Sequence, residues 1–298
     1  SDDPKTKLQV WKGASNEFVL PQRAFSDPEK LVLLHNRLGH YFPKKLIDGY
    51  MRKRYTGVTI PRMMLGQKAL SKLPKCSTCY MTKQRRRHFY SSGELIGKYL
   101  PGECIWVDLH IFINCIGFDG TAYKANFTDL ASGATFSYSI VTKDQLVDVL
   151  PTLKKEYHEF YGFIWKFLRS DQESVLLGKE VTSWLDENDI KPLLAPTDTP
   201  ELNGPAEGVN GILGSMTASM LHHSGRAVEF WPAAYAYAVN IKFVMPTNTL
   251  RGFMSPYEFL LHRTPDISHF RTWGSKCFVL EPRTEHRKDW HPHSVVGF

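Results

Sequence analysis

The sequence predicts an α/β core with a mixed sheet, placed between a small helical unit and the start of a small β module. Two observations predict the core. Three short segments between residues 104 and 141 alternate apolar and polar residues and are separated by turns, which is typical of an antiparallel meander. From residue 144 onward, segments of helical periodicity alternate with short apolar segments, as in strands joined by crossover helices.

Composition and charge limit the classes of protein to consider. With 298 residues, 42% of them hydrophobic and 22% charged, the chain is typical of a folded protein of one to three domains. No run of about 20 apolar residues predicts a membrane span, so we expect no membrane partner. Five scattered cysteines are too few for a disulfide scaffold and favour a reducing compartment. The net charge of +7 favours an anionic partner, first of all nucleic acid.

Residues 1–27 are expected to form an arm that packs on another part of the protein, because they show little periodicity. The helical unit, residues 28–95, follows. We expect its first helix to begin at Pro28 with Asp27 as its cap and to end at Gly39. Proline suits the first helical position, and glycine suits the position after the last.

Two histidines and a C-x2-C motif in this unit predict a structural zinc site. His35 and His40 are followed by Cys76 and Cys79, and these four ligand types suit tetrahedral zinc. The alternative is a core histidine with two unrelated thiols. The unit is small and has a modest apolar content, so metal binding would supply most of its folding free energy, on the order of 10–16 kcal/mol in finger peptides.

A run of basic residues lies beside Cys79 and predicts contacts with DNA phosphates. No acid falls between residues 72 and 88, and the cations assigned to DNA are Lys83, Arg85, Arg86 and Arg87. The alternative is a solvated charged surface. The same run could act as a nuclear import signal.

The core, residues 96–250, is predicted element by element. Strands are expected at 104–112, 122–129, 135–141, 164–168 and 191–195, and helices at 144–161, 179–188, from Glu207 to about 222, and 230–245. Pro205 is expected to start the helix that contains Glu207. The last helix is interpreted as packing only. Three antiparallel strands, followed by helix, strand, helix, strand and helix, is the order of a ribonuclease H-like α/β fold.

Three acidic residues are expected to meet on this core. Asp108 lies inside an apolar strand, where an unpaired carboxylate is costly, and 35 residues separate Asp171 from Glu207. In the predicted order the first strand is central, Asp171 lies just past its neighbour, and the helix of Glu207 crosses the sheet. Three converging carboxylates suit a pair of divalent cations. The alternative is that these are surface or capping acids.

Residues 251–298 are expected to form a linker and the start of a small β (SH3-like) module. The segments Ser255–Glu258 and Trp273–Val279 are interpreted as the start of this module, and the chain ends at Phe298 in mid-pattern, so we expect the module to be truncated. The histidine pairs His222–His223 and His291–His293 are interpreted as non-ligands.

These motifs, in this order, resemble the integrases of copia-type LTR retrotransposons, a branch of the retroviral integrase superfamily. The likeness covers residues 28–298. It includes the histidines with the C-x2-C motif, the three acids, and the segment Asn203-Gly204-Pro205-Ala206-Glu207-Gly208-Val209-Asn210. That segment is similar to the family signature Asn-Gly-x-Ala-Glu-x-x-Asn. Phe230-Trp231, Ser255–Glu258 and Gly274–Cys277 continue the likeness.

The resemblance implies a polynucleotidyl transferase that trims the 3′ ends of element DNA and joins them to target DNA. It implies Mg²⁺ or Mn²⁺ held by Asp108, Asp171 and Glu207, structural Zn²⁺, and a homo-oligomer on double-stranded DNA, with no small-molecule substrate. It implies a nuclear protein that passes through a cytoplasmic virus-like particle before import. Asn210, near Glu207, is expected to contact the substrate.

The sequence departs from the family pattern beside the acids. Gln172 and Glu173 stand where the family has Asn-Gly, and Gly208 and Gly211 stand where basic residues are usual. Glycine also costs roughly 1 kcal/mol in a helix relative to alanine. The departures keep open a catalytically weakened or domesticated zinc-stabilised DNA-binding or assembly protein. A different ribonuclease H-like nuclease is the third alternative, and the histidine and cysteine motif argues against it.

Overall fold

A five-stranded mixed sheet organises the structure. This is a computed structural model that describes residues 26–66, 70, 73–83, 99–112, 114–162, 165–170, 178–194, 200–247, 250, 252–280 and 294–297, without the side chains of 27, 159–161, 200–207, 280 and 294–295. The strand order is β3-β2-β1-β4-β5. The strands are β1 (Cys104–Ile111), β2 (Tyr123–Asp129), β3 (Thr135–Ile140), β4 (Phe167–Ser170) and β5 (Lys191–Leu194).

The first three strands are antiparallel, and β4 and β5 run parallel to β1. This is the predicted order with β1 at the centre, so the prediction of a mixed α/β fold is confirmed. The predicted limits of β4 were too early. Pairing with β1 starts where Phe167 meets Cys104, because the Glu103 carbonyl just before accepts from the amides of Lys166 and Phe167.

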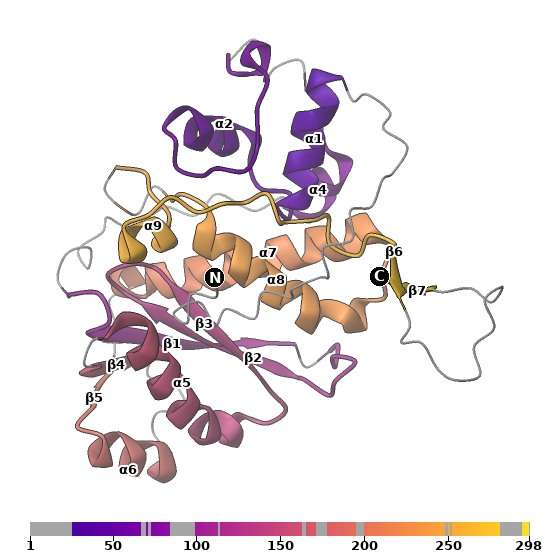
Figure 1. Cartoon of the computed structure of the whole chain (residues 1–298). Coiled ribbons are helices and arrows are strands. Elements are labelled where there is room, and N and C mark those ends of the chain that lie inside the picture. Colours follow the sequence, from indigo (N-terminus) through magenta and orange to yellow (C-terminus); the bar gives the residue numbers. More distant parts are fainter. Residues whose placement is uncertain are drawn as a thin grey trace.

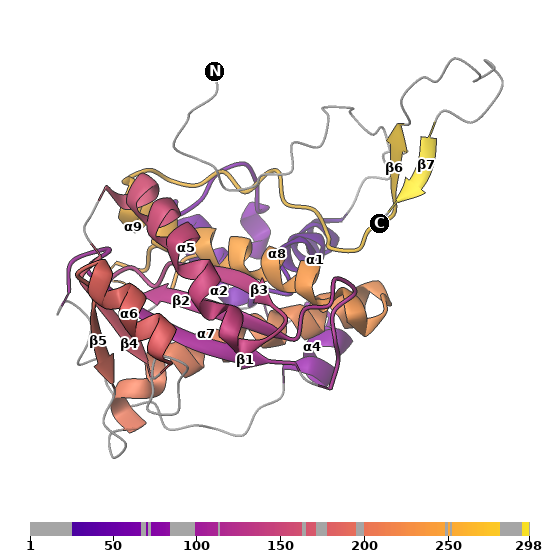
Figure 2. The ribbon, with the colours of Figure 1, turned by 90° about the horizontal axis from the view of Figure 1, so that it is seen from below.

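Helices cover both faces of the sheet (Figures 1 and 2). On one face lie α5 (Leu146–Tyr161) and α6 (Lys179–Glu187), which bury an apolar cluster against the odd-numbered residues of β1. On the other face lie α7 (Pro200–Ser224) and α8 (Trp231–Val244), the latter preceded by the short η4 (Val228–Phe230). On the face that α7 and α8 cover, Asn126 of β2 is buried, whereas Asp108 and His110 of β1 are half-buried.

The helix α7 begins earlier than predicted. The sequence placed its start at Pro205 and Glu207, but the backbone is helical from Pro200. Pro200 satisfies the preference for proline at a helix start as well as Pro205 does. Pro205 is then the sixth residue of the helix, where its missing N–H removes one backbone hydrogen bond.

The N-terminal helices α1 (Asp27–Arg37), α2 (Pro43–Met51) and α4 (Ser77–Thr82) lie over α7 and α8 (Figure 1). The short η1 (Arg62–Met64) packs on α1. The predicted cap of α1 was wrong by one residue. Ser26 is the N-cap, because Glu29, three residues later, accepts from the Ser26 amide and completes a capping box. The buried residues of these helices and of α7 and α8 form one apolar cluster.

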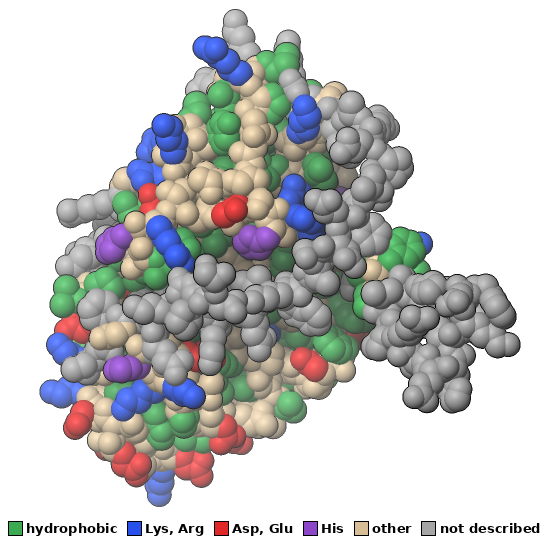
Figure 3. All heavy atoms as spheres, viewed as in Figure 1, with side chains coloured by type: hydrophobic (Ala, Val, Ile, Leu, Met, Phe, Trp, Pro, Cys, Tyr) green, Lys and Arg blue, Asp and Glu red, His purple; other side chains and the backbone are tan. Residues whose placement is uncertain are grey.

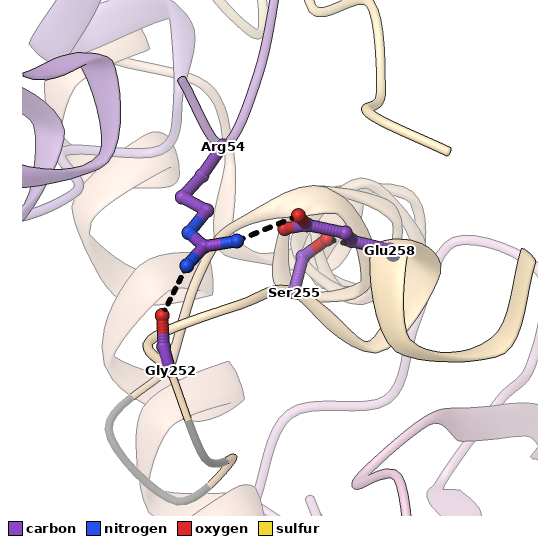
Figure 4. Close-up of polar contacts among 4 residues, drawn as sticks. All are labelled: Arg54, Gly252, Ser255 and Glu258. Carbon is purple, nitrogen blue, oxygen red and sulfur yellow. Dashed lines mark hydrogen bonds and ion pairs between the residues drawn. The ribbon is translucent and has the colours of Figure 1, made fainter. Parts of the chain in front are cut away.

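The C-terminal segment returns to the N-terminal helices. It contains α9 (Pro256–Leu261), capped by Ser255, and the Arg54 guanidinium contacts both Glu258 (2.8 Å) and the Gly252 carbonyl (Figure 4). Beyond it, β6 (Cys277–Leu280) pairs with β7 (Ser294–Gly297) as a two-stranded antiparallel sheet. The predicted start of a β module at Ser255–Glu258 was wrong, because Ser255 caps a helix that begins at Pro256. The described residues contain this two-stranded sheet and no SH3-like barrel. Among those residues, no helix is both long and apolar enough to cross a bilayer.

Candidate metal sites

The two predicted histidines and two predicted cysteines meet at one point. His35 lies in the last turn of α1, His40 follows that helix, and Cys76 and Cys79 lie at the start of α4. Their donor atoms all lie within 4.8 Å of one another. This group forms because Gly39 and His40 both adopt positive φ (56° and 58°), which turns the chain sharply after α1.

The spacing of the donor atoms matches a tetrahedral metal site. His35 Nε2 is 3.2 Å from His40 Nδ1 and 3.3 Å from Cys79 Sγ, and Cys76 Sγ is 3.4 Å from His40 Nδ1. A tetrahedron with metal–nitrogen bonds of about 2.0 Å and metal–sulfur bonds of about 2.3 Å has edges of about 3.3–3.8 Å. The four residues therefore fit zinc in geometry and in ligand type.

Neighbouring groups hold this donor set in its ligand form. His35 Nδ1–H donates to the Tyr41 carbonyl (2.6 Å), which leaves Nε2 as the nitrogen that faces the other donors. Burial lowers the pKa of His35 to about 4 and that of His40 to about 3, so both imidazoles are neutral. Burial raises the pKa of the Cys79 thiol to about 11, although Lys83 opposes this shift. A bound cation would reverse it, because a coordinated thiol loses its proton.

Two further predictions fall beside this group. The Lys83 ammonium donates to the His40 carbonyl (2.7 Å) and therefore braces the loop of the metal group. Its predicted contact with DNA stays a prediction, and Arg85, Arg86 and Arg87 lie outside the described residues. The group does not include His223, but the His223 ring lies 4.7 Å from the His40 ring.

The carboxylate of Asp108 ends a chain of hydrogen bonds across the sheet and its covering helices. Asn210 Nδ2, on α7, donates to Asp108 Oδ2 (2.7 Å). Asn126 Nδ2, on β2, donates to Asn210 Oδ1 (2.5 Å) and to the hydroxyl of Tyr235 on α8 (2.6 Å). That hydroxyl lies 3.2 Å from His110 Nδ1 on β1. The strand register explains the arrangement, because Asp108 is paired directly with Asn126.

The other two predicted acids are not placed relative to Asp108. Asp171 follows the last residue of β4 in the sequence and lies outside the described residues. Glu207 belongs to the backbone of α7, three residues before Asn210, but its side chain is not described. Convergence of the three acids stays a prediction.

A groove lies beside Asn210, between β1, α7 and the end of α4. Its volume is about 370 Å³, and its lining consists of small or polar residues and two rings: Thr82, His110, Phe112, Asn210, Gly211, Gly214, Ser215 and Ala218. A Cβ at position 214 would lie 2.8 Å from His110 Cε1, so glycine allows the His110 ring to approach the helix. Gly211, which stands where a basic residue is usual in the family, thus lines the groove next to Asp108.

Sequence reasoning missed Asn126 and Tyr235, which the structure links to Asp108. The helix of Tyr235 was interpreted as packing only, and its ring does pack against Phe112 and Trp231. The hydroxyl has a polar role besides. Asn126 alternates with apolar residues along strand 123–129, together with Lys124 and Thr128, and this polar side of the strand was the available signal.

Curated relatives of the chain are Pol proteins of plant transposons. It is 26% identical over 291 residues to the retrovirus-related Pol polyprotein from transposon RE1 of Arabidopsis thaliana, and 26% identical over 286 residues to that from transposon RE2 of the same plant. It is 23% identical over 284 residues to that from transposon TNT 1-94 of Nicotiana tabacum. These matches cover 96%, 95% and 95% of the chain but 18%, 18% and 20% of the relatives. The chain thus spans about one fifth of their length.

Similar solved structures include the catalytic core domain of BIV integrase (16% identity, TM-score 0.40, covering 54% of this chain and 95% of that one). They also include a chain of the simian T-cell lymphotropic virus intasome in complex with PP2A regulatory subunit B56 gamma (15% identity, TM-score 0.46, covering 74% and 75%). No model of a known protein family matches the chain. The plant relatives match almost its whole length, so the chain is similar to the retrovirus-related Pol polyproteins of transposons, and the predicted resemblance to this superfamily is confirmed.

Proposed function

We propose that this chain is the integrase segment of a retrotransposon Pol protein and that it cuts and joins DNA strands at a divalent-metal site. The position of Asp108 carries the proposal. Its carboxylate lies on the central strand and accepts from Asn210 of α7, the helix that also contains Glu207. Positions three apart on a helix are neighbours on its surface, so Glu207 would approach Asp108.

Each residue of the proposed cation site would have a distinct role. Asp108, with the predicted ligands Asp171 and Glu207, would hold the cations as ionised carboxylates, and Asn210 supports the ionised form of Asp108 by donating to it. Bound Mg²⁺ or Mn²⁺ ions would supply an activated water or 3′-hydroxyl and would stabilise the leaving oxygen. The substrate would be double-stranded DNA, both element ends and target, bound by a homo-oligomer.

Strand transfer between short DNA duplexes in Mn²⁺ tests the proposal. We expect joined product with the native protein and a loss of at least about 100-fold in Asp108→Asn and in Glu207→Gln, because both remove a ligand of the reacting cations. Glu229→Gln, which alters an exposed acid on η4, is the control and should retain activity. Product that persists in Glu207→Gln would exclude the triad, and no product with any duplex would exclude the activity.

We propose structural zinc for the His35, His40, Cys76 and Cys79 group, supported by its tetrahedral spacing. Purified protein should contain stoichiometric zinc by elemental analysis, and Cys76→Ser should lose it. Cys115→Ser, which alters a free cysteine outside the group, is the matched control and should keep its zinc. Stoichiometric zinc in Cys76→Ser would refute the ligand set.

We also propose nuclear localisation, with the basic run as both import signal and DNA contact. On the face shown in Figure 3, Lys and Arg side chains are spread rather than gathered in one band, so this face offers no continuous basic path among the described residues. The proposal therefore depends on Arg85, Arg86 and Arg87. Replacing all three with alanine should weaken DNA binding and flatten its dependence on salt. An unchanged salt slope would remove the run from the interface.

A second function, a DNA-binding or assembly protein with little catalysis, is favoured by one observation. The groove beside Asp108 is lined by Gly211 and Gly214 and, in its described lining, has no lysine or arginine to grip a DNA end. Salt-dependent DNA binding without joined product in Mg²⁺ or Mn²⁺ would support this function over the first.

A further inference from the structure

We infer that Tyr235 and Asn126 are positioning residues that fix Asp108 as a cation ligand. The inference rests on the proposed function, because it explains how the chain prepares one ligand of the proposed site. Asn126 is the backbone pairing partner of Asp108, and the inference concerns the side-chain hydrogen bonds. Each positioning residue acts through the Asn210 amide, which is the group in hydrogen-bond contact with the carboxylate.

The direction of the hydrogen bonds supports this role. Asn126 Nδ2 gives one proton to Asn210 Oδ1 and the other to the Tyr235 hydroxyl. The Asn210 amide must then present its oxygen to Asn126 and its NH₂ group to Asp108. The Tyr235 hydroxyl accepts from Asn126 and can donate its own proton to His110 Nδ1. The Asn210 amide therefore donates to the carboxylate and favours its ionised form, and the bond from Asn126 fixes the orientation of that amide.

Burial makes this direction hard to reverse. Asn126 is 2% exposed and Tyr235 is 0% exposed, between the sheet and α8. Asn126 Oδ1 has no hydrogen-bond partner within the described part of the chain. A buried acceptor without a partner is unfavourable. An amide flip would give that oxygen no better place, because it would face the Asn210 oxygen and remove the donor that Asn210 needs. In the observed orientation Asn126 Oδ1 has no partner, but Asn126 Nδ2 donates to Asn210.

The Tyr235 hydroxyl is the group whose removal tests the inference with least disturbance. The ring packs edge-on against Phe112 (5.9 Å) and Trp231 (6.5 Å), and phenylalanine would keep both contacts. Tyr235→Phe therefore removes the acceptor that orients Asn126 and the contact of the hydroxyl with His110 Nδ1. Asn126→Asp is the second variant, because a carboxylate cannot donate to the Asn210 oxygen and would reverse the direction of the chain.

Tyr237→Phe is the matched control. Tyr237 lies on the same helix, and its hydroxyl also makes two hydrogen bonds, donating to the Arg271 carbonyl and accepting from the Arg271 amide. It has no part in the chain that leads to Asp108. A structural effect of losing a tyrosine hydroxyl on α8 would appear in both tyrosine variants.

The experiment measures Mn²⁺ binding to the full chain by electron paramagnetic resonance, with zinc left in place and thermal unfolding followed in parallel. We expect Mn²⁺ affinity to fall about 10-fold or more in Tyr235→Phe and Asn126→Asp, the usual loss when a group that orients a metal ligand is removed. Tyr237→Phe should bind as the native protein does. Strand transfer in the two positioning variants should recover at high Mn²⁺, which a folding defect would not allow.

The failure of this inference is separable from failure of the proposed function. If native protein binds Mn²⁺ and Asp108→Asn does not, the proposed site stands. Native affinity in both Tyr235→Phe and Asn126→Asp would then overturn the positioning role alone, as would equal losses in Tyr235→Phe and Tyr237→Phe. If the native protein binds no Mn²⁺ and joins no DNA, the proposed site itself falls, and the inference falls with it.

Discussion

Lys124 is a buried lysine near the start of β2, on the face of the sheet that α7 and α8 cover. Its ammonium donates to Ser139 Oγ (2.6 Å) and lies 5.9 Å from the Trp231 ring centre. Burial lowers its pKa to about 8, although Asp119 opposes this shift. The folded protein therefore binds fewer protons here than the unfolded chain does between about pH 8 and the ordinary lysine pKa.

The sign of this difference predicts that stability rises with pH. The charged ammonium is disfavoured in the fold at pH 8 and below, and the cost disappears as pH rises toward the pKa of unfolded lysine, about 10.4. Urea midpoints at pH 8 and pH 9.5 should show this rise in native protein and a smaller rise in Lys124→Met. Lys191→Met removes an exposed lysine and should keep the native rise. Equal rises in all three proteins would contradict the prediction.

Residue types alone predicted the group of candidate metal ligands but not the contacts that support it. His35, His40, Cys76 and Cys79 were predictable because few structures other than a metal site use that set in that order, and the structure brings them together. The chain from Asp108 to Tyr235 was not predictable. That chain of hydrogen bonds depends on which residue of β2 pairs with Asp108 and on where α8 crosses the sheet. Neither can be predicted from local sequence patterns.

Gly39, at the scale of elements, joins α1 to the long helix beneath it. Its φ of 56° is unfavourable for other residues, and a Cβ there would lie 3.1 Å from Met216 Cε and 3.2 Å from Ile241 Cδ1. Gly133, in the turn between β2 and β3, has a similar φ of 70° but open space around it. An alanine at either position would adopt an unfavourable positive φ, but only at Gly39 would its Cβ also meet neighbouring side chains.

This difference predicts unequal effects of alanine. Gly133→Ala should lower the free energy of unfolding by about 1 kcal/mol through the backbone alone, and Gly39→Ala by about 2 kcal/mol, because the ends of the Met216 and Ile241 side chains must also give way. Gly39→Ala should in addition weaken zinc retention against a chelator, since His40 is the next residue. Urea unfolding and zinc release measure both effects. Equal losses at the two positions would show that the contact between the helices is loose.

The contact between Arg54 and Glu258 fastens α9 to the N-terminal helices (Figure 4). The two side chains are 23% and 17% exposed, so removing one leaves the other poorly solvated. We expect Glu258→Ala to cost about 2 kcal/mol, and the double variant with Arg54→Ala to cost less than the sum of the two single ones. The more exposed pair Lys166–Glu103 is the comparison, and Lys166→Ala should cost below about 1 kcal/mol. Additive losses at Arg54 and Glu258 would show that the pair contributes nothing.

Element order was largely predictable, and element limits less so. Alternation and helical periodicity predicted all five strands of the sheet and the helices on both faces. The start of α7 was missed because Pro200 and Pro205 are equally good helix starts by local rules, and packing on the sheet decides between them. The return of residues 252–273 to the N-terminal helices was also missed, because contacts such as Arg37 with the Phe270 carbonyl (2.7 Å) leave no local pattern.

At the scale of the whole molecule, the metal group and the sheet are joined through one apolar cluster. Leu31, Leu34 and Leu38 of α1 belong to the same cluster as Leu213 and Met216 of α7. Thr82 of α4 also shares a hydrogen bond with Ser219 of α7 (2.7 Å). Loss of the metal should therefore destabilise helices α7 and α8 as well as the segments that contain the ligands.

Chelation of zinc should loosen α7 and α8 together with α1. Hydrogen exchange measured by mass spectrometry should show all three helices losing protection at the same chelator concentration. Peptides from α5 and α6, which bury a different cluster on the far face of the sheet, should lose less. Loss of protection confined to α1, α2 and α4 would show that the metal unit folds independently.

The shared cluster also bears on how the gene should be cut for laboratory work. A fragment that starts near residue 96 keeps every strand of the large sheet but lacks the apolar residues of the N-terminal helices that cover α7 and α8. Met216, Met220 and Ile241 would then be exposed to solvent. Such a fragment should aggregate during expression, whereas one that retains α1, α2 and α4 should remain in solution.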